Sequence, residues 1–162
     1  IELNLSMKQC VQVDLKDKVL YYLKKYDLKP EQINLEITET AANTAQDVVE
    51  DNIRALSEQG ISFSLDDYGT GYSNLSRIID LPFSIVKIDK SMTDKVFDNK
   101  IHEILRYNIR LLKEIGMEVV VEGVETEEVL KQFEELGCDF IQGYYFSRPL
   151  PCQEFLEFMK MQ

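Results

Sequence analysis

Two adjacent acids at the end of an apolar run are the residues best suited to chemistry. The segment 65–74 reads LDDYGTGYSN and places Asp66 and Asp67 just before Gly69 and Gly71. Neighbouring side chains on a strand point to opposite faces, so we expect the strand to end between the two acids, with glycine supplying the positive φ of the break. Two carboxylates held together repel each other unless a cation lies between them. The segment therefore predicts a metal site, with an ordinary Asp-rich turn as the alternative.

The available ligand types favour a hard cation over zinc. Carboxylate and amide oxygens suit Mg²⁺ or Mn²⁺, whereas zinc sites use histidine and cysteine. His102 is the one histidine, and the three cysteines lack CxxC spacing. The GTG sequence at 69–71 also lacks the GK[ST] of a Walker loop. We therefore predict Mg²⁺ or Mn²⁺ at this site.

Polar residues recur wherever an apolar run ends. Short β-branched runs at 1–6, 33–38, 61–67, 84–90, 118–124 and 139–146 alternate with longer amphipathic stretches, a pattern typical of βα units around a parallel sheet. The residues at their ends are Asn4, Glu36, Asp66 with Asp67, Lys87, Glu122 and Gln142. In a TIM-type (β/α)8 barrel this edge of the sheet carries the chemistry. We predict an α/β fold of that type with about six βα units, although any one of these residues alone could be an ordinary surface or turn residue.

Three amphipathic stretches read as helices that end at glycine. They cover 45–60, 101–116 and 126–137 and finish at Gly60, Gly116 and Gly137, a common helix stop. In the second stretch the predicted inward stripe is Ile101, Ile104, Leu105, Leu112 and Ile115.

Composition narrows the classes of partner. The 162 residues predict one domain over 1–162, and the net charge of -11 argues against binding long nucleic acid. The net negative charge is compatible with binding of a small anionic ligand if metal ions supply positive charge at the site. No apolar leader or 18-residue apolar run occurs, so we expect a cytoplasmic location, with membrane tethering only through a region outside this sequence.

Six short motifs in order resemble those of the EAL-domain phosphodiesterases, which hydrolyse cyclic di-GMP to linear pGpG. They are NLS at 4–6, EITE at 36–39, DDYGTGYS at 66–73, KID at 87–89, EGVE at 122–125 and QGYYFSRP at 142–149. The resemblance covers almost the whole chain and implies metal-dependent hydrolysis of cyclic di-GMP.

The resemblance also implies a role for each strand-end residue. Asn4, Glu36 and Asp66 look like ligands of a first ion. Asp66 then bridges to a second ion held by Asp67 and Glu122. Lys87 would orient the attacking water or a phosphate oxygen, and Glu122 could instead be the general base.

Further residues look like supports of this site. Glu39 resembles the residue that steadies the glycine loop from Tyr68 to Ser73. That loop contains Gly69, Thr70 and Gly71. Gln142 resembles a substrate contact, and Asp89 and Glu125 are candidates for the substrate-binding wall, with surface charges as the alternative.

The sequence differs from the family pattern in one respect, because the Glu-Ala-Leu motif that names the family is absent. Two strands, a metal-ligating Glu and a phosphate-binding Arg would precede this sequence in the family. We therefore expect a C-terminal part of the domain that is weak or inactive alone and forms a homodimer to cover its open sheet edges. A sensory or GGDEF-type domain in the parent chain is expected from the same resemblance.

Two other functions compete with hydrolysis. A non-catalytic cyclic di-GMP-binding or regulatory interaction module would explain the missing Glu. A barrel enzyme that uses Lys87 as a base beside Mg²⁺ would explain the strand-end acids, but it gives the DDYGTGYS segment no role.

Overall fold

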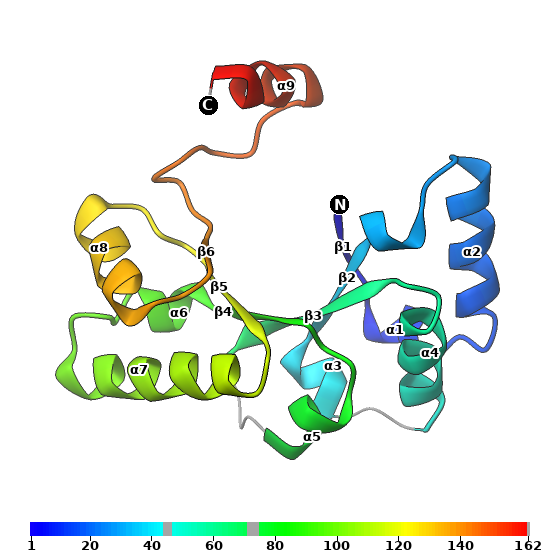
Figure 1. The fold of residues 1–162 in the computed structure, drawn as a ribbon, viewed down its shortest axis with the longest axis horizontal. Helices are drawn as coiled ribbons and strands as arrows, with labels where there is room; N and C mark the ends of the chain where they lie inside the picture. The colour runs from blue at the N-terminus through cyan, green and yellow to red at the C-terminus, as the bar shows by residue number, and fades with distance from the viewer. Residues whose placement is uncertain (44–46, 71–74, 162) are drawn as a thin grey trace.

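The predicted strands form one curled parallel sheet. The computed structural model describes residues 1–43, 47–70 and 75–161. Within these ranges the strands are β1 (Glu2–Asn4), β2 (Asn34–Thr38), β3 (Ser62–Tyr68), β4 (Ile85–Ile88), β5 (Glu118–Val121) and β6 (Phe140–Ile141). Their order in the six-stranded sheet is β1-β2-β3-β4-β5-β6, and every neighbouring pair is parallel. This confirms the α/β fold, and Figure 1 shows the sheet curled as in part of a β/α barrel.

Helices connect the strands and, apart from the C-terminal helix, lie around the outer side of the curled sheet (Figure 1). The longer ones are α2 (Leu15–Lys25), α4 (Asp47–Ser57), α7 (Asn99–Glu114), α8 (Glu127–Leu136) and α9 (Cys152–Met161). The short ones are α1 (Met7–Cys10), η1 (Pro30–Gln32), α3 (Glu39–Asn43), α5 (Leu75–Asp80) and α6 (Lys90–Thr93). The predicted helices are present as α4, α7 and α8, and α2 and α9 are additional. Across the described residues, no helix combines the length and apolar character needed to cross a membrane.

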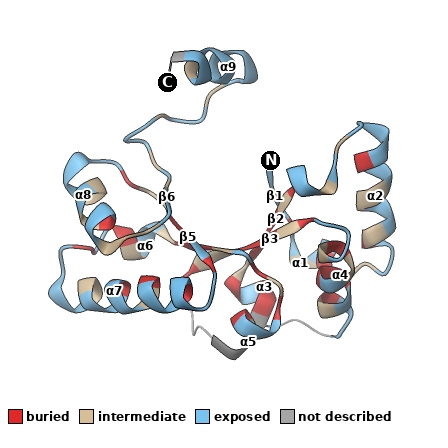
Figure 2. Cartoon of the chain, viewed as in Figure 1, coloured by how far each residue is buried: buried red, intermediate tan, exposed pale blue. Residues whose placement is uncertain are grey.

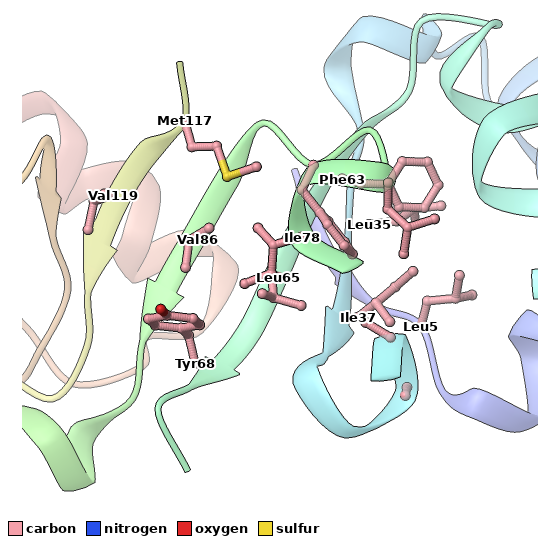
Figure 3. Close-up of a cluster of buried hydrophobic side chains, with 14 of the residues drawn as sticks. Leu5, Leu35, Ile37, Phe63, Leu65, Tyr68, Ile78, Val86, Met117 and Val119 are labelled. Atoms are coloured by element: carbon pink, nitrogen blue, oxygen red, sulfur yellow. The ribbon is translucent and has the colours of Figure 1, made fainter. Parts of the chain in front are cut away.

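The main core lies between the sheet and its covering helices (Figure 3). Alternate strand residues point into it, and these are Leu35, Ile37, Phe63, Leu65, Val86, Ile88, Val119 and Val121. Each such burial stabilises the fold by about 1.5–3 kcal/mol. Because strand side chains alternate between faces, Glu36 and Lys87 project to the opposite face of the sheet. The face of the sheet opposite the core is therefore free to carry the polar strand-end residues.

The inward stripe predicted for the second helix is partly wrong. Leu105, Ile109 and Leu112 are buried, but Ile104 and Ile115 are 47% and 40% exposed. Leu105, Ile109 and Leu112 are spaced i, i+4 and i+7, which is a narrow stripe on one helix face. Ile104 lies a third of a turn away from this stripe, and Ile115 follows the last helical residue. Figure 2 shows the exposed outer side of α7.

The three cysteines differ in accessibility, which predicts an order of alkylation. Cys10 is buried, Cys138 is half-buried and Cys152 is exposed on α9, a helix that stands apart from the sheet (Figure 1). Burial and the nearby Asp139 raise the pKa of Cys138 to about 11. The thiolate is the reactive form, so iodoacetamide at pH 8 is expected to label Cys152 first. Peptide mass spectrometry over time checks this, and equally fast labelling of Cys10 would contradict the packing around β1 and α1.

Candidate functional site

Three acids, two on separate strands and one just after a third strand, surround the ammonium of Lys87. Its Nζ lies 2.7 Å from Glu36 Oε1, 2.7 Å from Glu122 Oε1 and 3.7 Å from Asp66 Oδ1. Glu36 belongs to β2, Asp66 to β3 and Lys87 to β4, and Glu122 directly follows β5. The structure therefore brings four of the predicted site residues together, although they lie far apart in the sequence. We call this group the Lys87 cluster.

Strand register explains the convergence. Thr38 on β2 pairs with Asp66 on β3, and Lys87 on β4 pairs with Val120 on β5. Past the end of β5, the Glu122 N–H donates to the Ile88 carbonyl at 3.0 Å and carries the ladder one residue further. In-register parallel strands end at one edge of the sheet, so their last polar side chains meet there. Asn4 pairs in register with Glu36 and is exposed beside the cluster.

The Lys87 cluster is a buried ion pair network. Lys87 is 4% and Glu36 is 6% exposed. Burial by itself would lower the pKa of Lys87, but its hydrogen bonds with Glu122 and Glu36 outweigh this and hold the pKa above its ordinary value. Burial raises the pKa of Glu122, and the Lys87 hydrogen bond only partly opposes it. Lys87 is therefore a fixed cation at neutral pH, which argues against the enzyme class in which it acts as a base.

The cluster supplies ligands of the right type for a hard cation, but they do not surround an ion. Among the side chains described, no three His, Cys, Asp or Glu residues are placed to hold one metal together. The buried oxygen Asp66 Oδ1 accepts no hydrogen bond. Such an oxygen is one that a divalent cation would satisfy. The donor set thus fits Mg²⁺ or Mn²⁺, provided that the acids turn from Lys87 toward the ion.

The prediction that β3 ends between its two acids is wrong. β3 continues through Asp66 and Asp67 to Tyr68, and its pairing with β4 shifts register between Leu65 and Tyr68. Asp67 has a φ of 57°, so a bulge in the strand breaks the alternation of side chains. Asp tolerates this left-handed conformation better than most residues. Burial and the negative charges of Asp66 and Asp89 raise the pKa of Asp67. Asp67 therefore lies close enough to these two acids to interact with them electrostatically.

Glu39 contacts the start of the glycine loop that the family resemblance predicts it to steady. The Gly69 N–H donates to Glu39 Oε2 at 3.1 Å, and Glu39 is only 3% exposed at the start of α3. Gly69 has a φ of +97°, and the Thr70 hydroxyl donates to the Asp67 carbonyl at 2.9 Å. Gly71 lies outside the described residues. The contact shows how a buried carboxylate can hold the backbone just after the bulge.

A pocket of about 300 Å³ lies beside the Lys87 cluster. Its lining residues are Lys90, Glu122, Gly123, Glu125, Gln142, Gly143 and Tyr144. Two of the predicted substrate contacts, Gln142 and Glu125, therefore share a pocket with Glu122. The third, Asp89, caps α6 by accepting a hydrogen bond from the Ser91 N–H at 2.9 Å. The sequence analysis gave no role to Lys90, which follows the KID motif, or to Gly143 and Tyr144, which lie within the QGYYFSRP motif.

The chain is thus part of an open β/α barrel, and it has an acidic site centred on Lys87 at the carboxyl edge of its strands. The EAL domain model matches residues 1–149. The chain belongs to the EAL domain family.

Relatives with known names include two phosphodiesterases. The chain is 33% identical over 156 residues to the cyclic di-GMP phosphodiesterase RocR of Pseudomonas aeruginosa, covering 96% of this chain and 40% of RocR. The solved PaMucR phosphodiesterase in its c-di-GMP complex is 34% identical with a TM-score of 0.90, covering 96% of this chain and 63% of that one.

A second solved structure contains a metal. BlrP1 of Klebsiella pneumoniae, solved as a calcium/cy-diGMP complex, is 29% identical with a TM-score of 0.86 and covers 91% of this chain and 38% of that one. The chain spans less than two thirds of the length of each of these three relatives.

Proposed function

We propose that the protein hydrolyses cyclic di-GMP to linear pGpG with the help of Mg²⁺ or Mn²⁺. The observation that carries this proposal is the Lys87 cluster, in which acids from β2, β3 and the end of β5 meet at the carboxyl edge of the sheet. Membership in the EAL domain family and the phosphodiesterase names of RocR and PaMucR support it.

The residues that would hold divalent ions are Asn4, Glu36, Asp66, Asp67 and Glu122. A bound cation there supplies Lewis-acid stabilisation of charge on the phosphate. The calcium named in the BlrP1 complex supports binding of a divalent cation by this protein. Lys87 offsets part of the negative charge of Glu36, Asp66 and Glu122 when no ion is bound, and this helps to keep the carboxylates together before ligands arrive.

Hydrolysis requires that water attack one ring phosphodiester. A new P–O bond forms, one phosphate-to-ribose P–O bond breaks, the attacking water loses a proton, and the departing ribose oxygen takes up a proton to become a hydroxyl. Glu122 is the best-placed acceptor, because it is partly exposed at the pocket and burial raises its pKa. Lys87 orients the water or a phosphate oxygen, and Gln142 contacts the substrate in the same pocket.

One observation favours a second candidate function. No three acids among the described residues are preset around an ion, so a non-catalytic cyclic di-GMP-binding module is the alternative. The same protein fold and pocket would then bind the dinucleotide without cleaving it.

A single incubation separates the two functions. The full-length protein that contains this chain is mixed with cyclic di-GMP and Mn²⁺, and the nucleotides are separated by chromatography. Formation of pGpG that stops on addition of EDTA is the expected result. Bound but intact cyclic di-GMP would favour the binding module, and absence of both binding and cleavage would overturn both functions.

Gly143 is expected to be essential for the shape of the pocket. A Cβ at this position would lie 1.9 Å from the Val124 carbonyl oxygen and 2.4 Å from the Val124 nitrogen. The two loops are joined there, because the Val124 N–H donates to the Gln142 carbonyl at 3.2 Å and the Tyr145 N–H donates to the Val124 carbonyl at 3.0 Å. Gly143→Ala should therefore push Gln142 away from Glu122, costing about 1–3 kcal/mol of stability.

The expected functional result is at least about a tenfold loss of affinity for cyclic di-GMP, measured by calorimetry beside urea unfolding. Gly116→Ala is the matched control, because Gly116 has a φ of +88° with no atom within 4 Å of an added Cβ. That variant should lose stability and keep its affinity. Unchanged affinity in Gly143→Ala would show that the junction of the two loops does not shape the pocket.

A further inference from the structure

The pocket beside the Lys87 cluster has a second lysine with a different environment. Of the described residues that line it, Lys90 is the only one with a positive charge. Lys87 has two of its three ammonium donors engaged by Glu36 and Glu122 at 2.7 Å. A cyclic dinucleotide carries two phosphates, and the acids of the pocket would repel both. Lys90 is therefore the protein cation best placed to meet a phosphate in this pocket.

Lys90 is paired, but the pair is exposed. Its Nζ lies 2.7 Å from Glu125 Oε1 and 3.3 Å from Asp94 Oδ1, and the side chains of Lys90 and Glu125 are 46% and 49% exposed. Ion pairs as exposed as this contribute little to stability. Exchange of Glu125 for a phosphate oxygen therefore loses little on the protein side and makes a charge-assisted hydrogen bond to the ligand.

Gly123 directs the Lys90 side chain across the pocket. A Cβ on Gly123 would lie 2.4 Å from Lys90 Cγ and 2.6 Å from Lys90 Cβ. The lysine stem thus lies flat on the bare backbone between Glu122 and Val124. With its stem held there, the ammonium can change partners without moving out of the pocket.

We propose that binding of the cyclic dinucleotide opens the Lys90–Glu125 ion pair. Lys90 then binds a phosphate of the ligand. The released Glu125 accepts hydrogen bonds from the N1–H and N2–H of a guanine. This inference rests on the proposed function, adds Lys90 as a recognition residue and assigns guanine as the group that Glu125 contacts. A carboxylate only accepts hydrogen bonds, so it matches the two adjacent donors of guanine. The edge of adenine offers one donor and one acceptor and matches it poorly.

The test compares nucleotide affinities of matched variants of the full-length protein. Lys90→Met keeps the stem and removes the charge. Lys95→Met is the control, because it removes the same charge from an exposed position in the same segment. Glu125→Gln keeps the size of the side chain and adds a donor. Cyclic di-GMP and cyclic di-AMP are titrated into each protein by calorimetry with EDTA present, and thermal unfolding confirms that each variant is folded.

Lys90→Met is expected to bind cyclic di-GMP at least about tenfold more weakly, with Lys95→Met unchanged. Glu125→Gln is expected to lose about tenfold of the preference for cyclic di-GMP over cyclic di-AMP. Affinity of Lys90→Met within twofold of wild type would overturn the phosphate contact, and an unchanged preference in Glu125→Gln would overturn the guanine contact. If the wild-type protein binds neither nucleotide and forms no pGpG with Mn²⁺, the proposed function itself fails.

Discussion

Lys87→Met is expected to lower the free energy of unfolding by about 3–5 kcal/mol at neutral pH. Methionine matches the length of the lysine stem, but it leaves Glu36 buried and 6% exposed without its counterion. Glu122 loses its 2.7 Å partner at the same time. Removing one partner of a buried network costs more than the network contributes, because the remaining charges are desolvated and uncompensated. Urea unfolding of the metal-free protein measures the loss.

The loss has a predicted pH dependence. Without Lys87 the folded-state pKa of Glu122, which burial already raises, should rise further above its unfolded value, because the opposing hydrogen bond is lost. The variant is then destabilised above this pKa and recovers as pH falls and Glu122 takes up a proton. The difference from wild type should therefore shrink as pH falls.

The matched control for this prediction is Lys95→Met. Lys95 is exposed, so its loss should change stability by no more than about 0.5 kcal/mol. An equally small change in Lys87→Met would mean that the Lys87 cluster does not hold the strand ends together.

Asp66→Asn is expected to reduce hydrolysis of cyclic di-GMP by at least about 100-fold at limiting Mn²⁺. The change removes charge and preserves volume at an acid that would hold a divalent ion. Folding should change by less than about 1 kcal/mol, because Asp66 Oδ1 accepts no hydrogen bond and lies 3.7 Å from Lys87 Nζ. Initial rates and urea unfolding, measured on the same preparations, separate the two effects.

Asp51→Asn is the control for charge alone, because Asp51 is exposed on α4. Its turnover should equal that of wild type. Near-normal turnover of Asp66→Asn at limiting metal would contradict a role for Asp66 in ion binding.

Sequence periodicity predicted the sheet and the edge at which Glu36, Asp66, Lys87 and Glu122 meet. Runs such as INLEIT and SIVKID alternate core and polar positions, so Glu36 and Lys87 had to leave the core at the carboxyl edge of their strands. Parallel register then brings them together without any further signal in the sequence. The contact of Glu39 with Gly69 was found only through the family resemblance, because nothing in local spacing links residues 30 positions apart.

The features that sequence could not predict depend on tertiary contacts. Asp67 takes a positive φ of 57° inside a strand, whereas local rules assign that conformation to glycine. The width of the buried face of α7 depends on the elements that pack against this helix. Ile104 lies outside that face and is exposed although it is apolar. Lys90 has no motif signal of its own, and only the path of its side chain over Gly123 brings it into the pocket.

The central claim is that Glu36, Asp66 and Glu122 belong to one ion-binding site organised around Lys87. Binding of Mn²⁺ to the full-length protein, followed by electron paramagnetic resonance, tests it most directly in wild type and in Glu36→Gln, Asp66→Asn and Glu122→Gln. We predict that each single substitution weakens the same binding event by about 10- to 100-fold. Binding of Mn²⁺ that is unaffected by all three substitutions would contradict the claim.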